Sequence, residues 1–261
     1  KSKKKKEPYS IEKVKIDDII GNSDELVELR RKFKKVVDLD SPILITGETG
    51  TGKEMAARAI HNSGKRSKNT FIYVNCNAIP ANLLEGILFG IKKGSFTDAE
   101  EKIGLFQIAN NSTLFLDEVD SMPLEVQGKI LKAIEEKRIR PIGGEEEVNV
   151  NVRIIASCNV PIETLINSNQ LRSDLYFRLS VIQFELPKLR NRGVDVLLIA
   201  DYYIKYYNEF FDKKIKCVSE KTKEYFLSYD WPGNIRELKN TIEGVYHLVK
   251  DDIINFEDLK V

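Results

Sequence analysis

Two hydrophobic patterns alternate along the first 187 residues. Short, nearly continuous apolar runs predict buried strands at residues 43–46, 71–75, 113–117, 152–157 and 181–185. Between them, apolar residues recur every three or four positions, which predicts helices at residues 23–37, 53–62, 83–89 and 124–136. Strands that alternate with helices favour an α/β fold, in which helices cover both faces of a five-stranded, mostly parallel sheet.

After Pro187 we expect no further strands. Helical spacing predicts helices at residues 194–211, 219–229 and 234–249. The predicted domains are therefore a basic tail or linker at 1–15, an α/β domain at 16–187 and a small all-helical domain at 188–261. An aromatic stripe in the first of these helices is predicted to pack against the core. It comprises Tyr202, Tyr203, Tyr206, Tyr207, Phe210 and Phe211.

Composition narrows the class of protein. The chain has 261 residues, 42% of them hydrophobic and 31% charged, which is typical of a soluble globular protein of about two domains. Three cysteines, Cys76, Cys158 and Cys217, cannot all pair, and two histidines argue against a zinc site. No apolar run approaches the roughly 18 residues of a membrane-spanning helix, and no signal peptide opens the chain. We therefore expect a cytoplasmic protein with reduced thiols and no membrane contact.

The formal net charge of +1 conceals an asymmetry. Five lysines lie within the first six residues, and without them the balance is 36 − 40 = −4. The body is therefore mildly acidic and is not an obvious binder of nucleic acid. The basic tract is interpreted as a solvated linker, with phosphate contact as the alternative.

A glycine-rich loop follows the first predicted strand and precedes a helix. Its residues are Gly47, Glu48, Thr49, Gly50, Thr51, Gly52, Lys53 and Glu54. This is the context of a P-loop, in which backbone N–H groups and a helix N-terminus hold phosphates and the lysine neutralises them. The alternative is a plain glycine turn. Glu54 occupies the position where a hydroxyl usually binds Mg²⁺, so water, Thr51 or Asp117 would have to fill that role.

Two carboxylates end the third predicted strand. Asp117 and Glu118 follow the apolar run at 114–116, and ligands bind at this end of parallel strands. Asp117 is a candidate for Mg²⁺, and Glu118 for polarising the water that attacks a γ-phosphate. The alternative is that these two acidic residues only cap the end of the strand. Because the guanine signature Asn-Lys-x-Asp is absent, ATP is favoured over GTP.

With these motifs in order, the chain resembles the central AAA+ domain of bacterial enhancer-binding proteins, the activators of sigma-54 RNA polymerase. The resemblance covers about residues 16–260. Its landmarks are 47–54 (GETGTGKE), 74–80 (VNCNAIP), 88–99 (LFGIKKGSFTDA), 113–120, 171–179 (LRSDLYFRL) and 231–238 (WPGNIREL). Glu54 is usual in this family.

The resemblance implies roles for five further residues. Asn75 would hold Glu118 in a poised or released state, Asn159 would sense the γ-phosphate, and Arg236 would be a second sensor. Arg172 and Arg178 would be arginine fingers for the ATP of a neighbouring subunit, which requires a head-to-tail ring, a hexamer in this family. From the residues alone, Asn75 is a strand-end cap, Asn159 a turn residue, and the arginines surface partners of Asp174.

The resemblance also assigns a loop that grips sigma-54 within the RNA polymerase holoenzyme. The family reads Gly-Ala-Phe-Thr-Gly-Ala, and here the residues are Gly94, Ser95, Phe96, Thr97, Asp98 and Ala99. Asp98 replaces a glycine and adds a negative charge and a β-carbon. We expect a tolerated deviation, so that Asp98→Gly leaves hydrolysis within a few-fold and raises or preserves activation. A second pore element is expected in residues 135–148, where an ordinary hairpin is the alternative.

The sequence thus predicts an ATP- and Mg²⁺-dependent module that remodels sigma-54 holoenzyme from a closed to an open promoter complex. Since no helix-turn-helix is evident, we expect no specific DNA binding by this piece. A nucleotide-gated oligomerisation or regulatory module that has lost sigma-54 contact through Asp98 is the alternative. An AAA+ machine for another protein is a third possibility, which leaves the loop sequence unexplained.

Overall fold

The computed structural model describes residues 11–94, 100–249 and 251–259. Within them the chain forms two compact units. The sheet unit comprises residues 36–47 and 60–185, and the lid unit comprises residues 48–59, those from 186 onward and those before 36. Helices α1 (Asp24–Val36) and α2 (Lys53–Asn62) belong mainly to the lid unit and end in the sheet unit.

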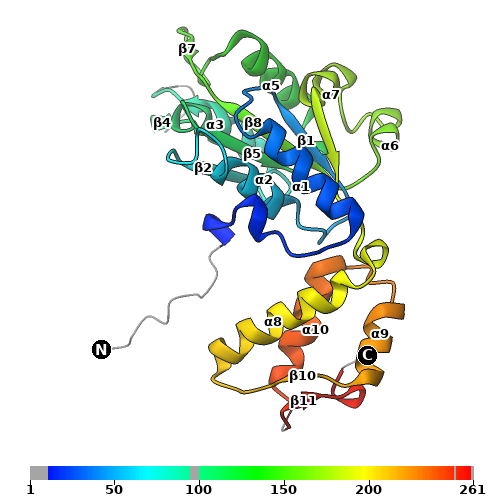
Figure 1. The fold of residues 1–261 in the computed structure, drawn as a ribbon. Coiled ribbons are helices and arrows are strands. Elements are labelled where there is room, and N and C mark those ends of the chain that lie inside the picture. Colours follow the sequence, from blue (N-terminus) through cyan, green and yellow to red (C-terminus); the bar gives the residue numbers. More distant parts are fainter. Residues whose placement is uncertain (1–10, 95–99, 250, 260–261) are drawn as a thin grey trace. The chain divides into compact units, whose positions relative to one another are not determined.

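Five parallel strands form the sheet of the sheet unit (Figure 1). In spatial order they are β2 (Phe71–Asn75), β5 (Thr113–Asp117), β8 (Arg153–Cys158), β1 (Ile43–Thr46) and β9 (Ile182–Glu185). The register aligns Asn75 with Asp117 and Leu116 with Ala156. The carboxyl ends of β2, β5 and β8 therefore lie at one edge of the sheet.

The three inner strands, β5, β8 and β1, are buried on both faces, which favours apolar residues in them. Side chains of one face, such as Leu44, Leu116 and Ala156, form one core with the helices of this unit. Those helices are α3 (Ala81–Phe89), α4 (Leu105–Ile108), α5 (Leu124–Glu136), α6 (Ile162–Asn167) and α7 (Ser173–Leu179). Helix α5 buries Val126, Ile130 and Ala133 on one side, which is the spacing of an amphipathic helix.

Two short antiparallel pairs complete the sheet unit. They are β3 (Gly90–Ile91) with β4 (Lys102–Ile103), and β6 (Arg138–Ile139) with β7 (Val148–Asn149). A 3-10 turn, η3 (Val119–Ser121), follows β5 after one residue, Glu118.

After residue 186, the lid unit contains the helices α8 (Asp195–Phe211), α9 (Glu220–Ser228) and α10 (Asn234–Tyr246). The Ser219 hydroxyl caps α9 by accepting the backbone N–H of Thr222. Trp231 is buried in the core and donates its indole N–H to the carbonyl of Phe226. The short elements are η1 (Ile11–Lys13), η2 (Ile16–Asp18), η4 (Leu189–Arg192), β10 (Cys217–Val218), β11 (Ile253–Ile254) and η5 (Phe256–Asp258).

The predicted fold class is confirmed, and one detail is wrong. Strands do not stop after Pro187, because β10 and β11 pair in parallel within the lid unit. The aromatic stripe packs as expected at Tyr207, which is buried, whereas Phe210 is half exposed. In the described ranges no helix combines the length and apolarity needed to cross a membrane.

Candidate functional site

The glycine-rich loop wraps around the carbonyl oxygen of Glu48. This oxygen accepts the Thr51 hydroxyl at 2.8 Å and the Lys53 ammonium at 3.1 Å. Gly50 and Gly52 have φ of +82° and +101°, which glycine adopts without strain. Lys53 is the first residue of α2, as a P-loop requires. Glu54 pairs with Arg58 one turn along at 2.8 Å.

A turn of the lid unit contacts this loop through Asn234. The buried Asn234 amide donates to the Thr49 carbonyl at 3.1 Å and to the Glu48 carboxylate at 3.2 Å, while its oxygen accepts the Leu189 N–H at 2.9 Å. The Ile235 N–H donates to the Gly50 carbonyl at 3.0 Å. A β-carbon at Gly50 would come within 2.2 Å of the Gly233 carbonyl. This close approach makes glycine necessary at position 50.

The carboxylate of Glu48 lies among cations of the lid unit. Lys188 contacts it at 2.5 Å and Arg190 at 4.0 Å. The Lys188 hydrogen bond, followed by that of Asn234, lowers the pKa of Glu48. These cations offset a negative charge that would otherwise disfavour phosphate in the loop.

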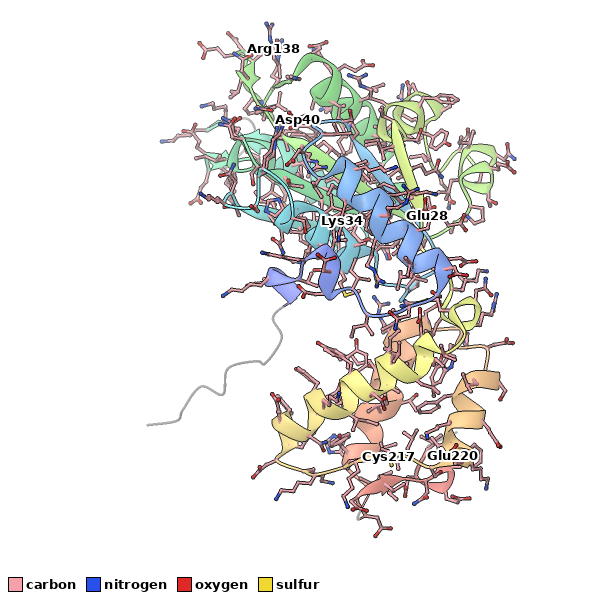
Figure 2. All side chains as sticks on the ribbon, in the orientation of Figure 1. Glu28, Lys34, Asp40, Arg138, Cys217 and Glu220 are labelled. Atoms are coloured by element: carbon pink, nitrogen blue, oxygen red, sulfur yellow. The ribbon has the colours of Figure 1, made fainter. Side chains whose placement is uncertain are left out.

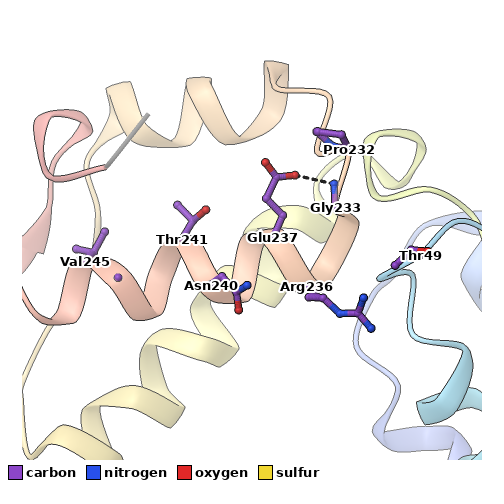
Figure 3. Close-up of a pocket in the computed structure, with 9 residues that line it drawn as sticks. Thr49, Pro232, Gly233, Arg236, Glu237, Asn240, Thr241 and Val245 are labelled. Carbon is purple, nitrogen blue, oxygen red and sulfur yellow. Dashed lines mark hydrogen bonds between the residues drawn. The ribbon is translucent and has the colours of Figure 1, made fainter. Parts of the chain in front are cut away.

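A cavity of about 500 Å³ opens between Thr49 and α10, and the exposed Arg236 lines it (Figure 3). The neighbouring Glu237 turns back and accepts the Gly233 N–H at 2.8 Å. The start of α10 thus holds the cationic Arg236 beside the P-loop.

At the carboxyl edge of the sheet, the Asp117 carboxylate is held by two hydroxyl groups. One oxygen accepts Ser157 Oγ, and the other accepts the Tyr73 hydroxyl at 3.2 Å. A carboxylate offers about four acceptor positions, so two hydrogen bonds leave room for a metal.

Glu118 has a left-handed backbone, with φ of 57° and ψ of 54°. Its carboxylate accepts the Asn159 side-chain amide at 2.6 Å. The predicted partner Asn75 instead accepts the backbone N–H groups of Asn77 and Ala78, both at 3.0 Å. The structure thus brings Glu118 to Asn159 and uses the Asn75 oxygen to cap the turn after β2.

The donor set fits Mg²⁺, which binds one or two carboxylates and keeps several waters. Asp117 is a half-buried hard oxygen donor. In the described part of the chain, no three or more His, Cys, Asp or Glu side chains form a metal-binding group. A magnesium ion would thus rely on Asp117, water and the nucleotide's own phosphates.

The two predicted finger arginines lie at opposite ends of α7. Arg172 precedes the helix, and its guanidinium donates to both oxygens of Asp174 at 3.0 and 2.8 Å. Arg178 is exposed in the last turn and lines a cavity of about 310 Å³ with Asp40 and Val181. With a rise of 1.5 Å per residue, the two lie about 9 Å apart along the axis.

Residues 19–185 match the family described as the sigma-54 interaction domain, and residues 190–261 match the AAA+ ATPase lid domain. The chain belongs to the sigma-54 interaction domain family. It is 44% identical over 236 residues to the transcriptional activator RocR of Bacillus subtilis, covering 90% of this chain and 51% of RocR. It is 41% identical over 244 residues to the response regulator PilR of Pseudomonas aeruginosa, covering 93% of this chain and 55% of PilR. The chain thus spans about half the length of these relatives.

Solved structures agree with this membership. The crystal structure of Brucella abortus NtrX in complex with ADP has a TM-score of 0.87 and 32% identity, over 93% of this chain and 55% of that one. The complex of the same protein with ATP has a TM-score of 0.86 and 33% identity, over 92% and 54%. Both of these structures of NtrX hold an adenine nucleotide.

Of the loop assigned to sigma-54, only Gly94 is described, with φ of +82°, and among the described residues no atom lies within 4 Å of where its β-carbon would be. Ser95, Phe96, Thr97, Asp98 and Ala99 lie outside the described residues. The other expected pore element, residues 135–148, covers all of the β6–β7 hairpin except its last residue, Asn149. There Glu147 contacts Lys132 and Arg140 at 3.4 Å and Arg138, labelled in Figure 2, at 3.7 Å.

Sequence reasoning missed three residues that organise the site. Ser157 had a detectable signal, a hydroxyl two residues before Asn159 in a strand that is otherwise apolar after its first residue, Arg153. Asn234 and Lys188 gave no such signal, because their roles depend on contacts with a loop about 140–190 residues away.

Proposed function

We propose that this sigma-54 interaction domain binds Mg-ATP, hydrolyses it in a head-to-tail ring and uses the cycle to remodel sigma-54 holoenzyme from a closed to an open promoter complex. The observation that carries the proposal is the Asp117–Glu118 pair, whose carboxylates accept hydrogen bonds from Ser157 and Asn159 at the carboxyl edge of the sheet, in a chain that also has the glycine loop and lysine of a P-loop. Membership of the family supports sigma-54 as the partner.

Each residue has a stated role in this proposal. The N–H groups of the glycine-rich loop and Lys53 bind the phosphates, and Arg236 adds a second cation. Asp117 holds Mg²⁺ directly or through water, and the bound ion would offset the charge of the β- and γ-phosphates. Glu118 orients and polarises the attacking water, an effect typically of about 10²–10⁴-fold in rate.

Four further residues couple hydrolysis to movement. Asn159 holds the Glu118 carboxylate and competes with water for it, and Asn75 is the second amide at this edge. Arg172 and Arg178 would stabilise the transition-state charge in the adjacent subunit, and such fingers contribute about 10³–10⁵ in rate. Residues 94–99 would then transmit the change to sigma-54.

The test is co-elution of the domain with sigma-54 on a sizing column, in ADP alone and in ADP with a metal fluoride that mimics the transition state. The proposal predicts a complex with the mimic only, and its loss in Phe96→Ala. If the domain still hydrolyses ATP but does not form this complex, the regulatory module is favoured. Asp98→Gly is then the next variant to test.

A further inference from the structure

Ser157 is a buried hydroxyl in the central strand of the sheet. All six residues of β8 are buried, and Ser157 has no exposed surface. A hydroxyl buried among apolar side chains destabilises a fold by a few kcal/mol unless it is hydrogen-bonded. The hydrogen bonds of Ser157 should therefore explain why a serine occupies this position.

The direction of both Ser157 bonds is fixed by chemistry. The Glu118 backbone N–H can only donate, so Ser157 Oγ accepts it, at 3.2 Å. The single hydroxyl proton is then free for the Asp117 carboxylate, which Ser157 Oγ contacts. One hydroxyl thus bonds two consecutive residues with different proposed tasks.

The two bonds constrain different features. The bond to Asp117 fixes the rotation of the carboxylate about its last torsion, with the Tyr73 hydroxyl on the other oxygen. The bond to the Glu118 N–H fixes a backbone that is left-handed, a conformation that costs a non-glycine residue about 1–2 kcal/mol. Tyr73 shares only the first of these constraints.

We propose that Ser157 is a positioning residue that sets the metal-binding orientation of Asp117 and the water-polarising orientation of Glu118 together. The inference rests on the proposed ATPase function and deepens it.

A serine of the same unit provides a matched control. Ser112 is also buried and precedes β5 at the opposite edge of the sheet, and among the described residues its Oγ has no hydrogen-bond partner. Ser112→Ala removes the same atom from a similar environment without touching Asp117 or Glu118.

The experiment compares Ser157→Ala, Tyr73→Phe and Ser112→Ala with the wild-type chain. Mn²⁺ binding in the presence of ADP is measured by electron paramagnetic resonance of the free ion, which needs no turnover. ADP affinity without metal, thermal unfolding and ATP turnover at saturating Mg²⁺ are measured in parallel. Tyr73 is partly exposed, so Tyr73→Phe is expected to fold whatever the effect of Ser157→Ala.

Ser157→Ala should weaken Mn²⁺ binding about ten-fold or more, as loss of a partner behind a metal ligand typically does, with metal-free ADP affinity within two-fold. Its turnover should stay about ten-fold low even at saturating Mg²⁺, because Glu118 also loses its constraint. Tyr73→Phe should weaken Mn²⁺ binding but recover turnover when metal saturates. Ser112→Ala should match the wild type in every measurement.

Two results would overturn the inference. Wild-type Mn²⁺ affinity in both Ser157→Ala and Tyr73→Phe would show that the hydroxyls do not position Asp117. Full recovery of Ser157→Ala turnover at saturating metal would show that Glu118 is positioned without it. If the wild-type chain bound no Mn²⁺ with ADP, the proposed ATPase function itself would fail, a result separate from either of these.

Discussion

Glu118 has both a strained backbone and a hydrogen bond to its carboxylate. Its left-handed backbone is unfavourable for a residue with a β-carbon, and its carboxylate is bound by Asn159 at 2.6 Å. Strain of this kind persists where surrounding contacts enforce it, and it is common at functional sites. The bond from Asn159 occupies one carboxylate oxygen, so its release would make that oxygen available to water.

Replacing Glu118 by glutamine should separate binding from hydrolysis. The amide keeps the size of the side chain but is not a base, so phosphate release should fall about 10²–10⁴-fold. Affinity for a fluorescent ATP analogue should stay within about three-fold of the wild-type value, since the P-loop is unchanged. Glu125→Gln, an exposed glutamate in the first turn of α5, is the matched control. Turnover within three-fold in Glu118→Gln would remove Glu118 from the reaction.

Sequence reasoning could place those candidate residues whose position follows from a predicted strand or loop. Lys53, Asp117 and Glu118 lie in the predicted P-loop or at a predicted strand end, and the structure has both elements at the predicted residues. The family resemblance points to Asn75 as the partner of Glu118, whereas the structure pairs Glu118 with Asn159, because the partner depends on the rotamer of a side chain at the end of a strand. The contact of Ser157 with two carboxylate-bearing residues likewise needed the strand register.

At the scale of elements, hydrogen bonds from the Asn234 side chain and the Ile235 N–H join the start of α10 to the P-loop. Asn234 has φ of +51° and no exposed surface, and its side chain bonds three groups of other segments. Buried donors left without partners cost about 1–3 kcal/mol each. The amide is therefore a structural link between phosphate-binding loop and lid helix within one unit.

Asn234→Ala should lower the free energy of unfolding by about 2–3 kcal/mol through the lost bonds and the positive φ. For a domain of this size, that corresponds to a drop of roughly 4–12 °C in melting temperature. Asn240→Ala, on an exposed position of the same helix, should stay within about 0.5 kcal/mol. Equal melting temperatures in a scanning calorimetry comparison of the two variants would show that the link contributes nothing.

Helices α1 and α8 are joined by the buried carboxylate of Asp195. It accepts the Asn22 N–H at 2.6 Å and the Ser23 hydroxyl at 2.7 Å, just before α1, and contacts Arg192 at 3.4 Å. Burial alone would raise the pKa of Asp195, but these hydrogen bonds together outweigh it and place the pKa below the ordinary 3.8. The folded chain therefore favours the ionised carboxylate.

This shift predicts a defined acid sensitivity. Because the folded pKa is lowered, the stabilisation is fully present above the ordinary carboxyl pKa and is lost as the pH falls through the folded value. Asp195→Asn should be less stable at pH 7 by about 2 kcal/mol and should lose less stability than the wild type between pH 5 and 3. Asp201→Asn, exposed on the same helix, should follow the wild-type curve. Parallel pH dependences for wild type and Asp195→Asn, followed by circular dichroism, would contradict this account.

Element prediction succeeded where hydrophobic period and length were both clear. Strands β1, β2 and β5 and helix α5 have the bounds that the pattern indicated. The pair β10–β11 was missed because each strand has two residues and their pairing joins segments 36 positions apart. Such short pieces carry no period of their own, so only the folded lid unit defines them.

For the whole molecule, the groups proposed for nucleotide chemistry are divided between the two units. The P-loop from Glu48 onward and Arg236 belong to the lid unit, whereas Asp117, Glu118 and Asn159 belong to the sheet unit. Arg172 pairs with Asp174, a neighbour in its own sequence, and both side chains are more than two-fifths exposed. Surface pairs of this kind contribute about 0–1 kcal/mol, so Arg172 can exchange Asp174 for a phosphate at small cost.

A mixing experiment tests whether the arginines act between subunits. Arg178→Ala alone should lack a finger, and Glu118→Gln alone should lack the group that polarises water, so each should be nearly inactive. In a randomly mixed ring, an intact Glu118 faces an intact Arg178 at roughly one quarter of the interfaces, since each has a probability of one half in a 1:1 mixture. The mixture should therefore regain up to about a quarter of wild-type phosphate release, with recovery increasing with protein concentration as rings form. The matched control is a mixture of Arg178→Ala with Arg172→Ala. Every subunit of these rings keeps Glu118 and lacks one of the two arginines. Activity of the first mixture no higher than the average of its two components would show that Arg178 serves its own subunit's nucleotide or none.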